Sequence, residues 1–528
     1  SRDAGKRYLL SGVAAIAMMT ACDQSGGSEA APLEEITLRE GDPADAPDVI
    51  SAMMLTNSGD GALAYESKDV DGANATFSNV TIADMDGVTI DSLVFEGLDM
   101  IDGQAAFSRM SFSGITYDAP EEADTSTLTV GEIELINPSP ALAAWVAGAL
   151  GTGEPADFPS VDQVAFDAWA VSDVSGDFSG TEAEGKYKLS SVNMRDFTGD
   201  KAALAEISGL SFDIVDEDDM NFKGGLDSMS VSGADLKFLT AMQQNAGDEE
   251  AMAAAMMSMM MSNPMEPGYD RISLDNFTFA GEGMDLAVPS VDAYVERNND
   301  GKPVRFVLEP TSMTLDADAD GGEVGAQLAE SLSMIGYEGI ELRMASISDY
   351  DPEKDALTFE ADDNYFELVD GARFSYGGDI SGYAEFNEQL AASMDMETLA
   401  EGGEPDPMVM QQAMGALEIG SLEIRVSDDS LIDRIFNAVA AQSGQDPEQM
   451  RAQASQMMGM APLMAQQAGV DVAIATELGT ALSSFIQDPK TLTIMIDPEE
   501  PVSMESLSTM EDPSMITKDY LGFSASNK

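Results

Sequence analysis

Three aspartates stand at the spacing of a calcium-binding loop. The segment Asp316-Ala-Asp318-Ala-Asp320-Gly321 places oxygen ligands at positions 1, 3 and 5, and a glycine at position 6 for the sharp turn. Position 12, which should supply a bidentate Glu, is Gln327. The sequence therefore offers a weak calcium loop, to be weighed against an ordinary acidic turn, and no confident metal site elsewhere.

Methionine is the second residue type that could bind a ligand. Met252, Met256, Met259 and Met260 fall at i, i+4, i+7 and i+8 of one predicted helix, and further methionines crowd the predicted helices that contain 408–414 and 450–464. Thioethers hold Cu(I), and they also pack adaptably in cores and against greasy ligands. The helical spacing favours a core stripe; the alternatives are an apolar groove for a lipid or partner, and a copper site.

Several chemistries are excluded by residue type. The chain has no histidine and one cysteine, which removes Ser-His catalysis, His-ligated metals, disulfides and dithiol redox chemistry. Carboxylate, Lys, Tyr or Ser–Lys chemistry remains possible, but we find no catalytic motif and no phosphate-binding loop. We therefore expect no catalytic residues, no cofactor and no enzymatic activity.

The charge restricts the partners. The 96 Asp and Glu against 25 Lys and Arg give a formal charge of −71, which excludes nucleic acid and adhesion to anionic lipid headgroups. We interpret the acids as a solubility surface for a salty habitat, where self-repulsion is screened. Capture of cations or of a basic partner is the alternative.

The beginning of the sequence has the features of a signal peptide. Arg2, Lys6 and Arg7 precede the apolar run 8–18. A run of this length is shorter than the ~20 residues that a membrane helix needs, but it suits the core of a signal peptide.

The four residues that follow, Met19-Thr20-Ala21-Cys22, resemble the lipobox of bacterial lipoproteins. The resemblance implies recognition of Met19, Thr20 and Ala21 by lipoprotein signal peptidase, cleavage before Cys22, and a diacylglyceryl thioether with an acyl anchor on Cys22. Leu is commoner where Met19 stands. A lipid-anchored protein of the cell envelope is therefore expected, on the periplasmic face of the inner or outer membrane.

The body alternates between strand and helix patterns. Period-2 alternation with Asp-Gly and Glu-Gly turns predicts short antiparallel strands. A strand, a cap and a helix recur at 129–151, 225–247 and 418–444. We predict a β-dominated α+β fold: an elongated antiparallel sheet built from irregular strand–helix repeats, with Met-rich capping helices.

The body from 48 onward resembles the uncharacterised β-rich periplasmic repeat proteins of proteobacteria and, more distantly, the AsmA-like envelope proteins. The AsmA-like resemblance implies long curved sheets that carry lipid. The predicted regions are a signal peptide 1–21, a flexible tether 22–47, a first repeat region 48–266 with helices near 140–150 and 236–262, a second repeat region 267–417, and a C-terminal strand–helix region 418–528. The longest helices are expected within 236–262, 386–417 and 430–468.

The leading hypothesis is a non-enzymatic, membrane-anchored envelope lipoprotein. It would act as a scaffold or as a binder of hydrophobic ligands such as lipids, with lipids or other envelope proteins as its partners. The alternatives are a carboxylate-based envelope hydrolase, which needs acids that converge in one cleft, and a calcium- or salt-responsive surface protein.

Overall fold

The chain forms two compact units in the computed structural model. Unit 1 comprises Ser1–Thr240 and Gly268–Glu282, and unit 2 comprises Ala241–Pro267 and Gly283–Lys528. The residues that the structure describes are 36–83, 85–118, 125–152, 157–180, 183–199, 201–216, 220–235, 265–393 and 407–528. Strands account for 49% and helices for 27%, so the predicted β-dominated α+β fold with an elongated antiparallel sheet is confirmed.

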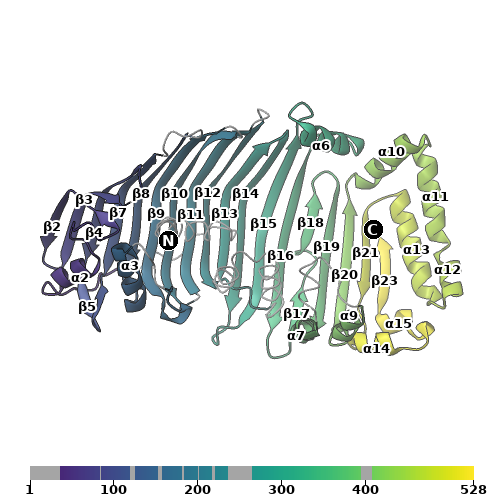
Figure 1. Ribbon diagram of the computed structural model, residues 1–528. Coiled ribbons are helices and arrows are strands. Elements are labelled where there is room, and N and C mark those ends of the chain that lie inside the picture. The colour runs from purple at the N-terminus through teal and green to yellow at the C-terminus, as the bar shows by residue number, and fades with distance from the viewer. Residues whose placement is uncertain are drawn as a thin grey trace. The chain divides into compact units, whose positions relative to one another are not determined.

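Unit 1 is built on an antiparallel sheet in which most strands pair with the next strand along the chain (Figure 1). The strands are β1 (Leu63–Ala64), β2 (Ser67–Asp71), β3 (Asn74–Ile82), β4 (Val88–Glu96), β7 (Arg109–Asp118), β8 (Thr125–Ile136), β9 (Ala165–Ser179), β10 (Ala183–Thr198), β11 (Lys201–Asp216), β12 (Asn221–Asp235) and β13 (Arg271–Gly281). The pairing order runs β2-β3-β4-β7-β8-β9-β10-β11-β12-β13, and β1 also pairs with β3.

The core of unit 1 lies where two helices cover the apolar face of this sheet. Helices α2 (Ala46–Ala52) and α3 (Pro140–Thr152) pack on the small hairpin of β5 (Asp99–Ile101) and β6 (Gln104–Ala106), and a 3-10 turn, Val161–Gln163, precedes β9. Phe77, Phe95 and Leu93 are completely buried there. Alternate residues of each strand point to one face, so the period-2 pattern of the sequence directly supplies this core.

The described end of the predicted tether lies against unit 1. The Arg39 amide donates to Asn137 Oδ1 at 3.1 Å, and Asn137 Nδ2 donates to the Thr37 carbonyl at 2.9 Å. The Asp42 amide donates to the Leu98 carbonyl at 2.9 Å. The chain is therefore held across the ends of β4 and β8 from Thr37 onward.

Unit 2 has its own run of antiparallel strands (Figure 1). They are β14 (Met284–Arg297), β15 (Pro303–Ala317), β16 (Gly339–Asp351), β17 (Ala356–Phe359), β18 (Tyr365–Leu368), β19 (Ala372–Ser381), β20 (Glu418–Asp428), β21 (Thr491–Ile496), β22 (Val502–Ser503) and β23 (Phe523–Asn527). β17 and β18 together fill one strand position, because both pair with β16 on one side and β19 on the other.

The helices of unit 2 lie between and beyond these strands. They are α6 (Glu323–Met334), α7 (Tyr383–Ser393), α9 (Pro407–Met414), α10 (Leu431–Ser443), α11 (Pro447–Gly459), α12 (Ala461–Ala468), α13 (Val472–Gln487), α14 (Met504–Thr509) and α15 (Lys518–Leu521), with a 3-10 turn at Pro513–Met515. Helix α13 packs on β21 and β23, and α11 and α12 pack on α13 (Figure 1).

Two of the predicted strand-to-helix switches are present, and one expectation about the helices is wrong. β8 leads to α3 and β20 leads to α10, where Asp428 Oδ1 accepts the Ile432 amide at 2.9 Å. The switch at 225–247 and the helix at 236–262 extend outside the described residues. The longest described helix is α13, with 16 residues, which lies outside the predicted ranges. The apolar residues of α13 lie on one face of the helix, and this face packs on the sheet. Packing of this face outweighs the lower helix propensity of its β-branched residues.

Candidate functional site: an uncovered apolar face

One face of the sheet in unit 2 carries a ladder of ion pairs. Arg343 Nε lies 2.7 Å from Glu341 Oε1, and Arg343 Nη1 lies 3.9 Å from Glu367 Oε1. Arg373 also reaches Glu367, at 3.8 Å. Cross-strand pairing places these side chains together, because Arg343 is opposite Glu367 and Glu367 is opposite Arg373. This face is solvated, and each exposed pair is worth little by itself.

The opposite face of the same strands is apolar. Met344 of β16 is opposite Phe366 of β18, and Phe366 is opposite Phe374 of β19. In β19 and β20, Tyr376 is opposite Ile424. The strand period of two makes this division unavoidable once Arg343, Glu367 and Arg373 face the other way. We call Phe366, Phe374, Tyr376 and Ile424 the apolar patch.

The apolar patch is centred on the ring of Tyr376. Its centroid lies 6.2 Å from that of Phe366, 6.2 Å from that of Phe374 and 5.9 Å from that of Phe359. Aromatic rings at such separations attract one another in addition to the area they bury. The rings therefore form one continuous aromatic surface.

Among the described helices, α13 covers only part of this face. Helix α13 buries Phe485 against Leu492 of β21, with Val426 and Ile494 packed around them. On β20, β19 and β18, which are one, two and three strands from β21, large apolar side chains are partly exposed to solvent: Ile424 and Phe374 are each 41% exposed, and Phe366 is 52% exposed. A row of adjacent, exposed large apolar groups is the kind of surface that binds a ligand or partner.

A buried asparagine positions β18 and therefore Phe366. Asn364 is fully buried in the loop between β17 and β18. Its Oδ1 accepts the Ile347 amide at 3.0 Å and the Ser346 hydroxyl at 2.8 Å. Its Nδ2 donates to the carbonyls of Ile347 at 2.9 Å and Glu360 at 2.8 Å. The side chain therefore replaces the backbone ladder where the strand position is interrupted.

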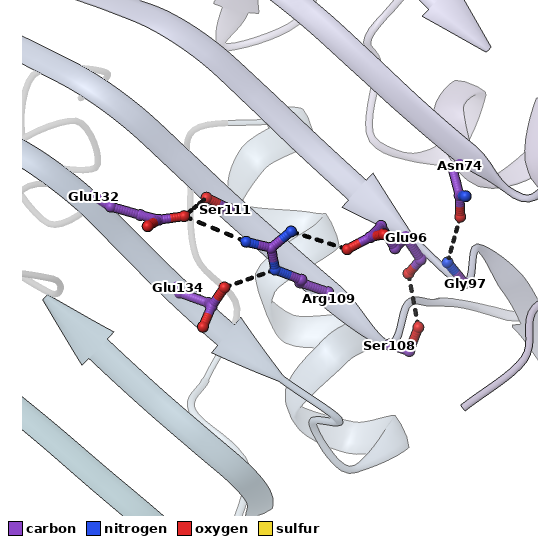
Figure 2. A network of polar contacts seen from close by, with 8 residues as sticks. All are labelled: Asn74, Glu96, Gly97, Ser108, Arg109, Ser111, Glu132 and Glu134. Atoms are coloured by element: carbon purple, nitrogen blue, oxygen red, sulfur yellow. Dashed lines mark hydrogen bonds and ion pairs between the residues drawn. The ribbon is translucent and has the colours of Figure 1, made fainter. Parts of the chain in front are cut away.

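Three glutamates of unit 1 lie close together, as the hydrolase alternative would require. Figure 2 shows Arg109 between three carboxylates: its Nη1 lies 2.9 Å from Glu96 Oε2, its Nε 2.6 Å from Glu134 Oε2, and its Nη2 3.3 Å from Glu132 Oε1. Ser111 Oγ donates to Glu132 Oε1 at 2.5 Å. All these side chains come from β4, β7 and β8, so the arginine neutralises acids that strand pairing brings together.

The charge of Arg109 is secure at every accessible pH. Burial alone would lower the pKa of its guanidinium, but the hydrogen bonds and charges of Glu96 and Glu134 outweigh burial and raise this pKa above its ordinary value. A permanent cation that occupies the space between the carboxylates leaves them in structural ion pairs. This group therefore lends no support to carboxylate catalysis.

A polar cavity of 310 Å³ in unit 1 lies where the N-terminal segment is fastened. Asp167 and Asp196 line it together with Arg39 and Asn137. Asn137 Nδ2 donates to Asp167 Oδ2 at 2.6 Å, and Asn137 Oδ1 accepts the Arg39 amide. These groups hold the segment in place, and the hydrolase alternative remains a prediction.

The three aspartates of the predicted calcium loop are not assembled around one point. Asp316 belongs to β15, and its Oδ1 lies 2.1 Å from where a Cβ on Gly339 would stand. Asp318 Oδ1 accepts the amide of Asp320 at 3.0 Å, which is an ordinary turn-forming contact. In the described ranges no three His, Cys, Asp or Glu side chains are grouped to hold a metal ion. The calcium prediction gains no support from this geometry.

Two predicted sites lie outside the described residues. They are the lipobox, Met19, Thr20, Ala21 and Cys22, and the first methionine run, Met252, Met256, Met259 and Met260. The other methionine runs are described, and there Met408, Met457, Met460 and Met464 are exposed. In the part of the chain that is described, every helix is too short or too polar to cross a bilayer.

The apolar patch was missed from sequence, although a signal for it was present. The stretch 365–376, YFELVDGARFSY, alternates aromatic with charged or small residues on both sides of a turn. Such alternation predicts a hairpin with one apolar face. Whether a second layer covers that face cannot be read from the alternation.

The C-terminal part of the chain is similar to one family model. A family model described as an uncharacterized protein matches residues 365–528, which begin at the first residue of β18. The match includes the apolar patch and helices α7 to α15, and it covers less than half of the chain. No curated protein matches the sequence.

Proposed function

We propose that the protein is a non-enzymatic lipoprotein of the cell envelope, anchored to a membrane through Cys22, that binds the hydrocarbon part of a lipid on the apolar patch of unit 2. The anchor is inferred from the lipobox Met19-Thr20-Ala21-Cys22. The binding surface is inferred from the uncovered sheet face. One observation carries the proposal: Phe366, Phe374 and Ile424 are exposed side by side around Tyr376.

The chemistry of the apolar patch favours hydrocarbon over a polar ligand. Its four side chains offer one hydroxyl and no charge, while the charged groups of the same strands, Arg343, Glu367 and Arg373, point to the other face. An acyl chain would satisfy such a surface, because each buried methylene is worth ~0.8 kcal/mol. Ten methylenes could gain up to ~8 kcal/mol before the costs of association.

The charge of the chain restricts the lipid further. A formal charge of −71 repels anionic headgroups, so the ligand should be neutral or cationic outside its hydrocarbon. The probe chosen for a test is therefore an uncharged lipid, a fluorescent diacylglycerol.

The test is a pair of substitutions in the apolar patch. Phe366→Thr with Phe374→Thr removes both exposed rings and replaces them with a β-branched residue that also favours strands. We expect the affinity for the fluorescent diacylglycerol to fall about tenfold or more, since ~1.4 kcal/mol of lost contact already gives that factor. The variant should remain folded because both rings are about half exposed, with a somewhat lower melting temperature from the loss of their contacts with Tyr376. Fluorescence titration measures the affinity.

Val70→Thr supplies the matched control, because Val70 is an equally exposed apolar residue in a strand of unit 1. It should leave binding unchanged. An unaltered affinity in the double variant would remove the apolar patch as the site. A native protein that binds no uncharged apolar probe would end the ligand-binding proposal.

A further inference from the structure

A second apolar surface lies on the outer helices of unit 2. Its members lie on α11, α12, the start of α13 and the junctions between these helices. We call them the Met-rich surface: Met457, Met460, Leu463, Met464, Val470 and Val472. All are exposed, with Met464 at 65% and Met457 and Leu463 at 59%. Such values are unusual for large apolar groups that stand so close together in the chain.

Small residues explain why the methionines point outward. α11 packs on α13 through Ser455, whose hydroxyl lies 2.6 Å from that of Ser483 and which is buried. A Cβ on Gly479 of α13 would stand 2.6 Å from the Met458 carbonyl oxygen and 3.0 Å from Ala461 Cβ. Close packing through serine, glycine and alanine leaves no room for long side chains at this interface. The methionines are therefore left exposed on α11 and α12. Helix α13 lies between these two helices and the strands (Figure 1).

The segment 452–470, which carries all of the Met-rich surface except Val472, is also free of charge. No Asp, Glu, Lys or Arg occurs between Arg451 and Asp471, in a chain in which 23% of residues are charged. The flanking Arg451 is engaged in an ion pair with Asp433 of α10, and Asp471 caps α13 by accepting the Ala473 amide at 2.7 Å. Solubility alone does not account for an uncharged, exposed helical segment in so acidic a protein.

We infer that the Met-rich surface docks on a neutral lipid bilayer, as a second, non-covalent membrane contact in addition to the anchor. A second copy of the chain is a poor occupant because each copy carries −71. A basic partner would find only one carboxylate between Met457 and Val472, that of Asp471, and both of its oxygens already accept backbone amides, from Ala473 and Lys518. A zwitterionic lipid surface has no net charge, so it is not repelled by the protein and needs no carboxylate to bind. Flexible thioether side chains also adapt to disordered acyl chains. The inference does not depend on ligand binding by the apolar patch.

A local probe tests this contact in the full chain. With Cys22→Ser removing the only native thiol, Met464→Cys is labelled with an environment-sensitive fluorophore. Met515→Cys is the matched control, because Met515 is 63% exposed and lies outside the Met-rich surface. With phosphatidylcholine vesicles we expect a blue shift, and quenching by brominated lipid, at position 464 and not at 515. The blue shift and the quenching report only the surroundings of position 464. Attachment of the protein to the vesicle through another segment would therefore not produce them.

Further variants sharpen the test. Adding Leu463→Asp to the labelled chain should weaken vesicle binding reported at 464 about tenfold, since a charge must then enter the interface. With anionic vesicles the shift should be weaker at low salt and recover as salt is raised. Phe366→Thr with Phe374→Thr should leave the shift at 464 intact, so failure of the proposed ligand site is distinguishable from failure here.

Three outcomes would overturn the inference. The probe at 464 could remain unshifted at saturating phosphatidylcholine. The emission of a probe at 515 could shift as much as that of the probe at 464, which would indicate non-specific adsorption. The emission of the probe at 464 could shift without vesicles as the protein concentration rises, which would identify an interface between copies of the chain.

Discussion

Among single residues, the alternation of side chains along a strand places charged and apolar residues on opposite faces of the sheet. Arg373 and Phe374 are neighbours in β19, yet the first joins an ion-pair ladder and the second an aromatic surface. The sorting depends on register, since a slip of one residue would exchange the two faces. Residues that fix the register therefore also fix the candidate site.

Asn364 is such a residue, and its removal should be costly. Asn364→Ala leaves the Ile347 amide and the carbonyls of Ile347 and Glu360 without their buried partner. Each unsatisfied buried group costs ~1–3 kcal/mol, so with three such groups we expect the free energy of unfolding of unit 2 to fall by about 3 kcal/mol or more. Urea denaturation measures it. Asn299→Ala, in an exposed turn, should change it by less than about 0.5 kcal/mol, and a similarly small loss for Asn364→Ala would mean that water replaces the side chain.

At the scale of elements, helix α13 connects the outer helices to the sheet. Its Phe485 packs on Leu492 of β21, and its Ser483 contacts Ser455 of α11. Glu477 extends this connection, because its Oε1 accepts the Ala525 amide of β23 at 3.1 Å and its Oε2 pairs with Lys518 of α15. The position of the Met-rich surface therefore depends on α13.

Glu477 should make this connection sensitive to acid. The hydrogen bond from Lys518, and then that from the Ala525 amide, lower the pKa of Glu477 below its ordinary 4.5. A lowered carboxyl pKa stabilises the folded state above pH 4.5, and the contribution is lost as the pH falls through the folded-state pKa. We expect Glu477→Gln to reduce the free energy of unfolding by about 0.5–1 kcal/mol at neutral pH, with a smaller difference from the native protein as the pH falls.

Urea denaturation at several pH values measures this difference. Glu499→Gln, at an exposed position outside these contacts, is the control and should behave as the native protein at each pH. A pH-independent loss in Glu477→Gln would show that packing, and not the ion pair, is responsible.

At the scale of the whole molecule, charge opposes folding. A chain with −71 repels itself, and salt screens the repulsion as the Debye length falls from ~10 Å at 0.1 M to ~3 Å at 1 M. We expect the melting temperature to rise between ~0.05 and ~1 M NaCl in a calorimetric scan. Tetramethylammonium chloride at equal ionic strength should act alike. A flat or falling melting temperature would show that repulsion is minor, and a far larger rise with calcium at matched ionic strength would favour the calcium-responsive alternative.

The sequence by itself determined the fold class, because its signals are local. Alternation between neighbouring residues already assigns Arg343 and Met344 to opposite faces of a strand, whatever lies above them. The switches from β8 to α3 and from β20 to α10 are likewise local changes of hydrophobic period. The chemistry that is excluded also follows from the sequence alone, since no fold can supply a missing histidine.

Which apolar residues are covered depends on contacts between distant segments, and the sequence pattern does not reveal it. The period-2 pattern is the same for Ile424 and for Ile494, yet α13 packs beside Ile494 and leaves Ile424 in solvent. Helical spacing favoured a core stripe for the first methionine run, but in the described run Met457 and Met464 face outward because α11 and α12 meet α13 through Ser455 and Ala461. The burial of a side chain depends on which element packs against it and on the side chains of that element. These packing partners belong to segments that are distant in the sequence.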